Sequence, residues 1–193
     1  HASIARGRTE MECYTPAAAE TLAEMIREMP GWRPVGFSGS GLTAMFVAGR
    51  STAMPHGFVR GHGIQKGDVL VSGASAGVDG YQSELERTMV AGEPTAGQRH
   101  AFEAMLALQS AAIDAIAPGV PAGEVELAVI RLAEDVGVRD HLRHHVGHSI
   151  GLEGHEAPFL DRGEEAVLEP GREIFQAASQ EQLCGGLRRV DEG

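Results

Sequence analysis

The Asp79-Gly80 pair constrains the fold of this chain more than any other sequence feature. Asp-Gly favours the tight turn of a β-hairpin, because that turn needs positive φ angles that most residues avoid. The apolar segment Val69–Val71 precedes the pair and Tyr81 follows it. We therefore predict an antiparallel hairpin around this turn, with another buried strand over Leu42–Ala48.

Three helical patterns are interleaved with these strands. The first covers Ala17–Met29, with Thr15 as the N-cap and a proline in the first turn. The others cover Gly97–Ile116 and Glu124–Asp135. The residues expected to line the inner face of the second helix are Phe102, Met105, Leu106, Ile113 and Ile116. Helices and antiparallel strands mixed in this way predict an α+β fold in one domain, residues 1–193.

Composition limits the classes of partner. The net charge of −11 argues against nucleic acid, because a phosphate-binding surface needs clustered Lys and Arg residues. Neither a signal peptide nor an apolar run of membrane-spanning length is visible. The two cysteines, Cys13 and Cys184, have no metal-ligand spacing and fit a reducing compartment. We expect a cytoplasmic protein with no membrane or nucleic-acid partner.

Two carboxylates two residues apart form the first candidate site. Glu84 and Glu86 would point to the same face of a strand, together with Gln82. Such a pair can share a proton, bind a cationic substrate group or bind a metal ion. The alternative is a solvated strand face that forms salt bridges through Arg87.

Three histidines in glycine-rich segments form the second candidate site. His56 precedes Gly57, and His148 and His155 alternate with glycines and are followed by Glu156. Imidazole exchanges protons near neutral pH and is a common metal ligand, although a lone histidine is more often structural. A nucleophilic triad is less favoured, because no GxSxG motif is present and neither cysteine has a nearby histidine.

The order of these motifs resembles one family. The chain reads PHG at Pro55–Gly57, DGYxS at Asp79–Ser83, RT at Arg87-Thr88, GHSIGLEGHEAP at Gly147–Pro158 and LEPG at Leu168–Gly171. This succession is similar to that of the M24 peptidases, which include methionine aminopeptidase, Xaa-Pro peptidase (prolidase) and creatinase. The resemblance implies the pita-bread fold, a pseudo-two-fold curved antiparallel sheet covered by helices. The best match covers residues 42–171, whereas 1–14 and 172–193 are divergent or truncated. We therefore expect a pita-bread fold that is incomplete at both ends.

The resemblance also implies a metal site, which this chain matches poorly. Metallopeptidases of the family bind two ions through two Asp, one His and two Glu side chains. The corresponding positions here are Gly73, Glu84, His148, one near Ala177 and one near Val190. Only the histidine is a clean match, and two hard ions need several oxygen ligands. We therefore expect no metal cofactor; if a metal such as Mn, Co, Zn or Fe is bound, its ligands would be Glu84, His148 and Asp191.

Creatinase is the metal-free member that the chain also resembles, through the segment GYxxxLERT at Gly80–Thr88. By this resemblance, our main hypothesis is metal-independent hydrolysis of a C–N bond in a small amide or guanidino compound. His56 would be the acid–base group and Glu86, with Glu84, would bind the cationic side of the substrate. His148 and His155 would polarise the carbonyl. The other substrate-binding candidates are Tyr81 and Glu156.

Two alternatives remain at this point. One is an Xaa-Pro aminopeptidase or dipeptidase whose metal site is rebuilt, and the other is a non-catalytic peptide-binding member of the family. In each case the partner is a small molecule or a short peptide. Relatives that act on small molecules are often dimers, so the resemblance also implies a homodimer.

Overall fold

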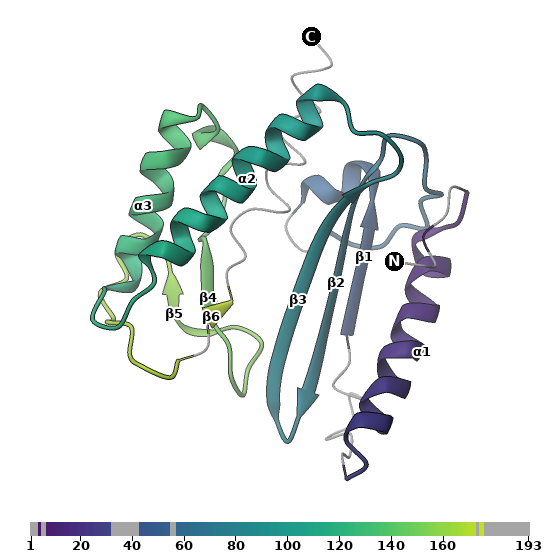
Figure 1. Ribbon diagram of the computed structural model, residues 1–193, viewed down its shortest axis with the longest axis horizontal. Helices are drawn as coiled ribbons and strands as arrows, with labels where there is room; N and C mark the ends of the chain where they lie inside the picture. The colour runs from purple at the N-terminus through teal and green to yellow at the C-terminus, as the bar shows by residue number, and fades with distance from the viewer. Residues whose placement is uncertain (1–3, 5–6, 32–42, 55–56, 173, 176–193) are drawn as a thin grey trace. The chain divides into compact units, whose positions relative to one another are not determined.

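The computed structural model describes residues 4, 7–31, 43–54, 57–172 and 174–175 (Figure 1). The chain divides into two compact units. The first unit contains residues 1–94 with 152–154, and the second contains residues 95–151 with 155–193. Each unit combines helices with antiparallel strands, as the α+β prediction requires.

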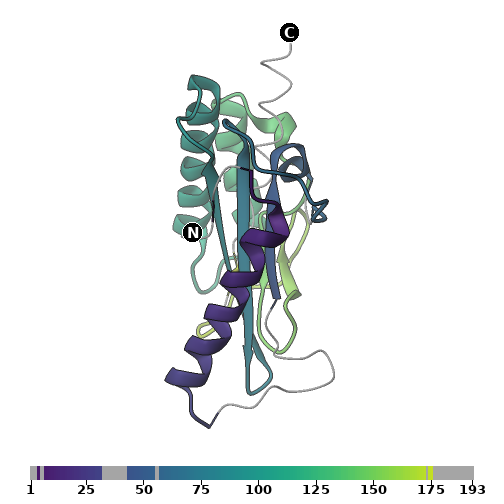
Figure 2. The same ribbon diagram turned by 90° about the vertical axis from the view of Figure 1, so that its right-hand side faces the viewer.

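The first unit is built on a three-stranded antiparallel sheet in the order β1-β2-β3. The strands are β1 (Thr43–Ala48), β2 (Val69–Val78) and β3 (Tyr81–Val90), and a short 3₁₀ helix, η1 (Gly49–Ala53), follows β1. Asp79 and Gly80 have φ angles of 51° and 93°, so the predicted hairpin between β2 and β3 is confirmed. The helix α1 (Glu10–Glu28) lies along this sheet beside β1 (Figure 2).

The start of α1 differs from the prediction. The helix begins at Glu10 rather than after Thr15, because Thr9 and Glu12 form a capping box that satisfies the first backbone N–H groups. Pro16 consequently lies inside the helix, where it cannot donate a backbone hydrogen bond. The Thr15 hydroxyl donates to the carbonyl of Met11 at 2.9 Å instead of capping a helix.

Glu10 ties α1 to the rest of the first unit. This side chain is fully buried, and its carboxylate accepts backbone N–H groups from three residues far along the chain. The donors are Ala48 at 2.8 Å, Arg60 at 2.7 Å and His62 at 3.2 Å. The buried apolar cluster beside it consists of Cys13, Phe46, Ala48, Ile64 and Leu70.

In the second unit two helices pack against each other, and the second of them packs on a small sheet. The helices are α2 (Ala96–Ala115) and α3 (Ala122–Asp135), followed by the 3₁₀ helix η2 (Arg139–His141). The strands β4 (Gly147–Ser149), β5 (Glu156–Leu160) and β6 (Ile174–Phe175) form an antiparallel sheet in the order β5-β4-β6. Both helices end within two residues of their predicted boundaries, because their end signals are local.

The inner face of α2 differs from the prediction. Phe102, Leu106 and Ile113 are exposed, by 39%, 41% and 57%. The buried residues of the helix are Ala101, Ala104, Met105, Leu108 and Ala112. α2 packs against α3, whose buried face also carries alanines, and small side chains allow two helices to approach closely. Helix–helix packing therefore selects the alanine-rich face instead of the most apolar one.

None of the helices in the described residues combines the length and apolarity that a membrane crossing requires.

Candidate functional site

His148 is buried at the centre of the sheet in the second unit. It lies on β4 between Phe159 of β5 and Phe175 of β6, and only 1% of its surface is exposed. Its Nδ1 atom lies 3.0 Å from the carbonyl oxygen of Ser149. Because a carbonyl only accepts hydrogen bonds, we infer that Nδ1 carries a proton, which in the neutral imidazole leaves the lone pair on Nε2. A histidine held in this tautomer can bind a metal ion or accept a proton.

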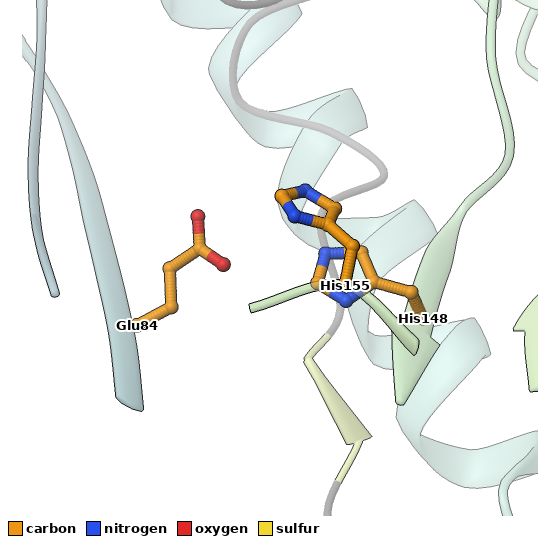
Figure 3. A group of neighbouring side chains, drawn as sticks. All are labelled: Glu84, His148 and His155. Carbon is orange, nitrogen blue, oxygen red and sulfur yellow. The ribbon is translucent and has the colours of Figure 1, made fainter. Parts of the chain in front are cut away.

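His155 lies next to His148 within the same unit. The two ring centroids are 4.1 Å apart with an angle of 34° between the ring planes, and Figure 3 shows the imidazoles side by side. One nitrogen of each ring lies within 4.8 Å of the other. Unlike His148, His155 is exposed. The pair therefore joins a fixed imidazole to one that a solute can reach.

The loop between β4 and β5 holds Glu156 close to the backbone. The strand register shifts between His148 and Ser149, and the Ser149 hydroxyl donates to the carbonyl of Pro158 at 3.2 Å. A Cβ atom on Gly151 would lie 2.6 Å from Oε1 of Glu156. A side chain at position 151 would therefore require Glu156 to move, whereas glycine leaves room for this carboxylate where it lies.

The structure adds one histidine that the sequence interpretation missed. The His145 ring lies 6.0 Å from that of His148 and 5.2 Å from that of Phe159, measured between centroids. The only signal in the sequence was the adjacent pair His144-His145 before the GHSIG motif. His145 is therefore a neighbour of both His148 and Phe159.

The candidate carboxylates of the first unit share one face of β3, as predicted. Gln82, Glu84 and Glu86 are half-buried, whereas the residues between them are exposed. Arg87 is on the opposite face, where its Nη1 donates to the backbone carbonyl of Glu86 at 2.6 Å. Tyr81 is also on the opposite face and is 64% exposed. Tyr81 is therefore not grouped with the two glutamates.

Gly73 of β2 makes room for Glu86. The two residues are opposite each other in the β2–β3 register. A Cβ atom on Gly73 would lie 3.3 Å from Cγ and 3.5 Å from Oε1 of Glu86. The position where the resemblance calls for an aspartate thus lies under the side chain of Glu86. A carboxylate is present at this point of the sheet, although it comes from the neighbouring strand.

Several predicted residues lie outside the described part of the chain. These are His56, Ala177, Val190 and Asp191. The roles assigned to them stay predictions, as do the catalytic and substrate-binding roles of the other candidates.

The profile of the family described as "Metallopeptidase family M24" matches residues 2–175. The chain belongs to this family. An Xaa-Pro dipeptidase of Pyrococcus furiosus is 34% identical over 189 residues, which is 97% of this chain and 51% of that protein. A probable dipeptidase PepE of Mycobacterium tuberculosis is 32% identical over 167 residues, covering 86% of this chain and 41% of the relative.

Solved structures of M24 proteins agree with this assignment. The dipeptidase PepE from Mycobacterium ulcerans has a TM-score of 0.78 and 29% identity, covering 92% of this chain and 47% of its own. A prolidase from Pyrococcus furiosus has a TM-score of 0.75 and 29% identity, covering 92% of this chain and 52% of its own. The predicted pita-bread fold and family are confirmed. This chain spans about half the length of these relatives.

The expectation that no metal cofactor is needed is wrong. The matching family is one of metallopeptidases, and relatives are named Xaa-Pro dipeptidases. The expectation rested on comparing ligand types at single positions, whereas the family assignment rests on residues 2–175 together. Each unit contains atoms of a type that binds divalent metals. In the second unit this atom is Nε2 of His148, and in the first unit the atoms are the carboxylate oxygens of Glu84 and Glu86.

Proposed function

We propose that this chain forms the metal-binding part of a peptidase that cleaves short peptides, with Xaa-Pro dipeptides as the first substrates to test. The observation that carries this proposal is the buried His148, whose Nδ1 faces the Ser149 carbonyl and whose Nε2 can therefore bind a metal. The names of the relatives support the substrate class. They favour it over the creatinase-like hypothesis that the sequence suggested first.

A bound divalent ion would supply a Lewis acid for the peptide carbonyl and an activated water at neutral pH. His148 is the nitrogen ligand in this proposal, and the family resemblance adds Glu84 as a carboxylate ligand. Glu86, which covers Gly73, supplies a further carboxylate on the same strand face. The proposed ligands thus include the Glu86 carboxylate beside Gly73, the position at which the family resemblance calls for an aspartate.

The exposed ring of His155 suits contact with the substrate. An imidazole can donate a hydrogen bond to a peptide carbonyl and can return a proton to the amine that leaves. Its neighbour Glu156 lies against Gly151, and its negative charge would attract the amino group of a peptide. Both residues follow the buried His148 closely in the chain, so they depend on the same strand pair for their position.

The test uses the 193-residue chain and two matched variants. Metal binding is measured by calorimetry with Mn²⁺, Co²⁺ and Zn²⁺, and hydrolysis is measured on an Xaa-Pro dipeptide before and after chelation. We expect His148→Ala to weaken metal binding by more than about 100-fold, because even indirect partners of a ligand cost 10–100-fold. His100→Ala, an exposed histidine on α2, should leave both measurements unchanged.

Hydrolysis that survives complete metal removal would contradict the proposal. Peptide binding without hydrolysis by the metal-loaded chain would favour the non-catalytic alternative. The homodimer and the cytoplasmic location are further parts of the proposal. Light scattering on the purified chain tests the first and subcellular fractionation tests the second.

A further inference from the structure

Glu126 of α3 is an unusual residue in the interior of the second unit. Only 7% of its surface is exposed. Its Oε2 atom is wholly buried and, among the described residues, has no hydrogen-bond partner. Burial of an ionised carboxylate oxygen without a partner is costly, so this group needs a proton or a cation to neutralise it.

The turn that follows β5 packs onto the start of α3. The N–H of Gly123 donates to the carbonyl of Glu164 at 3.0 Å. A Cβ atom on Gly123 would lie 2.8 Å from that oxygen and 3.1 Å from the carbonyl oxygen of Asp161. Glu126 follows Gly123 by three residues and therefore lies on the same face of the helix. The packing thus brings the turn at Asp161 against the face that carries Glu126.

Two charged residues of this turn act on Glu126. Burial is the main factor that raises the pKa of Glu126, followed by a hydrogen bond to the Asp161 side chain; the negative charge of Asp161 raises it further. The backbone N–H and the positive charge of Arg162 act in the opposite direction. The pKa of Glu126 is raised overall. A proton on one carboxyl group gives the pair the donor that it otherwise lacks.

We propose that Glu126 and Asp161 share one proton, and that this hydrogen bond is a pH-sensitive link between α3 and the end of β5. The link matters for the candidate site because β5 begins at Glu156 and its Phe159 pairs with His148. Glu126 and Asp161 are therefore positioning residues for the strand beside the two histidines. A proton fits this place better than a cation, because the Arg162 charge would repel a second positive ion.

The direction of the pH dependence follows from linkage. A carboxyl group with a raised pKa in the folded state contributes stability that is complete below its ordinary value of 4.5 and is lost as the pH rises through the folded-state pKa. Glu126→Gln keeps the shape and supplies an N–H donor to Asp161 at every pH. The difference in stability between this variant and the wild type should therefore depend on pH.

The experiment measures melting temperatures of the full chain from about pH 5 to pH 8, which spans the region above the ordinary carboxyl value. Relative to Glu126→Gln, we expect the wild-type melting temperature to fall by about 2–4 °C with rising pH. The control is Glu124→Gln, an exposed glutamate on the same helix, which should follow the wild type. A constant difference between wild type and Glu126→Gln would overturn the proposal.

Two further measurements keep the proposal testable if Glu126→Gln does not fold. Asp161→Asn should also reduce the pH dependence, because it removes the acceptor charge at an exposed position. Infrared spectra of the wild type should contain the C=O band of a buried protonated carboxyl group. Absence of that band, or a rise in melting temperature caused by Ca²⁺ in the wild type only, would overturn the shared proton in favour of an ionised pair.

Discussion

The two units bury a glutamate in opposite ways. Glu10 and Glu126 both lie on helices and are both more than nine-tenths buried. Glu10 accepts three backbone N–H groups, so its two oxygens are satisfied by fixed donors. Glu126 has one oxygen without a partner and a carboxyl group as its neighbour. Two carboxyl groups that are buried to a similar extent therefore differ in what surrounds their oxygens: fixed backbone donors for Glu10, and a second carboxyl group for Glu126.

Glu10→Gln is expected to cause the largest loss, because the change replaces an acceptor with an NH₂ group that faces backbone donors. We expect the free energy of unfolding to fall by about 1.5–3 kcal/mol, the range for hydrogen bonds to a charged group. Chemical denaturation measures this change, and Glu20→Gln, exposed on the same helix, is the control. A loss as small as that of Glu126→Gln at neutral pH would remove the contrast between the two glutamates.

Gly123→Ala and Gly151→Ala test how each glycine supports a carboxyl group. At Gly123 the new methyl group meets the backbone carbonyl of Glu164, so the turn over Glu126 must shift; we expect a loss of about 1–3 kcal/mol. At Gly151 it meets the end of the Glu156 side chain, which can rotate away, so the loss should stay below about 1 kcal/mol.

The same two variants separate stability from activity. Displacement of Glu156 by Gly151→Ala should lower peptide hydrolysis more than Gly123→Ala does, although the second variant is less stable. Thermal melts and dipeptide assays on the two proteins measure this. Equal losses of stability would mean that the turn at Asp161 is loosely packed, and it would weaken the link proposed for Glu126.

The capping boxes at the starts of α1 and α2 can also be compared, and this comparison involves the smallest expected change in stability. Thr95 and Gln98 cap α2 without a titrating group, so Thr95→Ala should cost about 1 kcal/mol at every pH. In α1, the backbone N–H of Thr9 is the main factor that lowers the pKa of Glu12. That stabilisation is present above the ordinary value of 4.5 and is lost as the pH falls through the folded-state pKa.

Thr9→Ala keeps this backbone N–H but removes the Thr9 hydroxyl, whose hydrogen bond to Glu12 also lowers the pKa of that carboxyl group. The effect of Thr9→Ala should therefore diminish in acid, whereas the effect of Thr95→Ala stays constant. Circular dichroism melts at neutral and acidic pH compare the two variants. If both effects changed equally with pH, the Glu12 carboxylate would not be part of the cap.

Local rules explain why some elements were predictable. The hairpin at Asp79-Gly80 and the start of α2 depend on residues within a few positions of each other. The common face of Glu84 and Glu86 follows from strand geometry alone. The predicted start of α1 was wrong, although the capping box of Thr9 and Glu12 is also a local signal. Thr15 followed by Pro16 is a competing helix-start signal, and the prediction followed it.

Of the candidate site, His148, His155 and Glu156 could be identified by pattern, whereas their environment could not. The Ser149 carbonyl near Nδ1 of His148 and the contact between the two imidazole rings occur where the β4–β5 register shifts, and no local pattern indicated that shift. The proximity of the Glu86 carboxylate to Gly73 is a further feature that depends on strand pairing and that no local pattern indicates.

The amino-acid sequence by itself determined the α+β class, the hairpin, the family and the residues that can carry chemistry, since these follow from spacing and turn chemistry. Only the tertiary structure decided which face of α2 is buried and which glutamates are buried. Glu10 meets its donors 38 to 52 residues away, and Glu126 meets Asp161 across a helix–turn contact. Burial and charge state depend on atoms that are distant in the chain, and a local pattern carries no information about them.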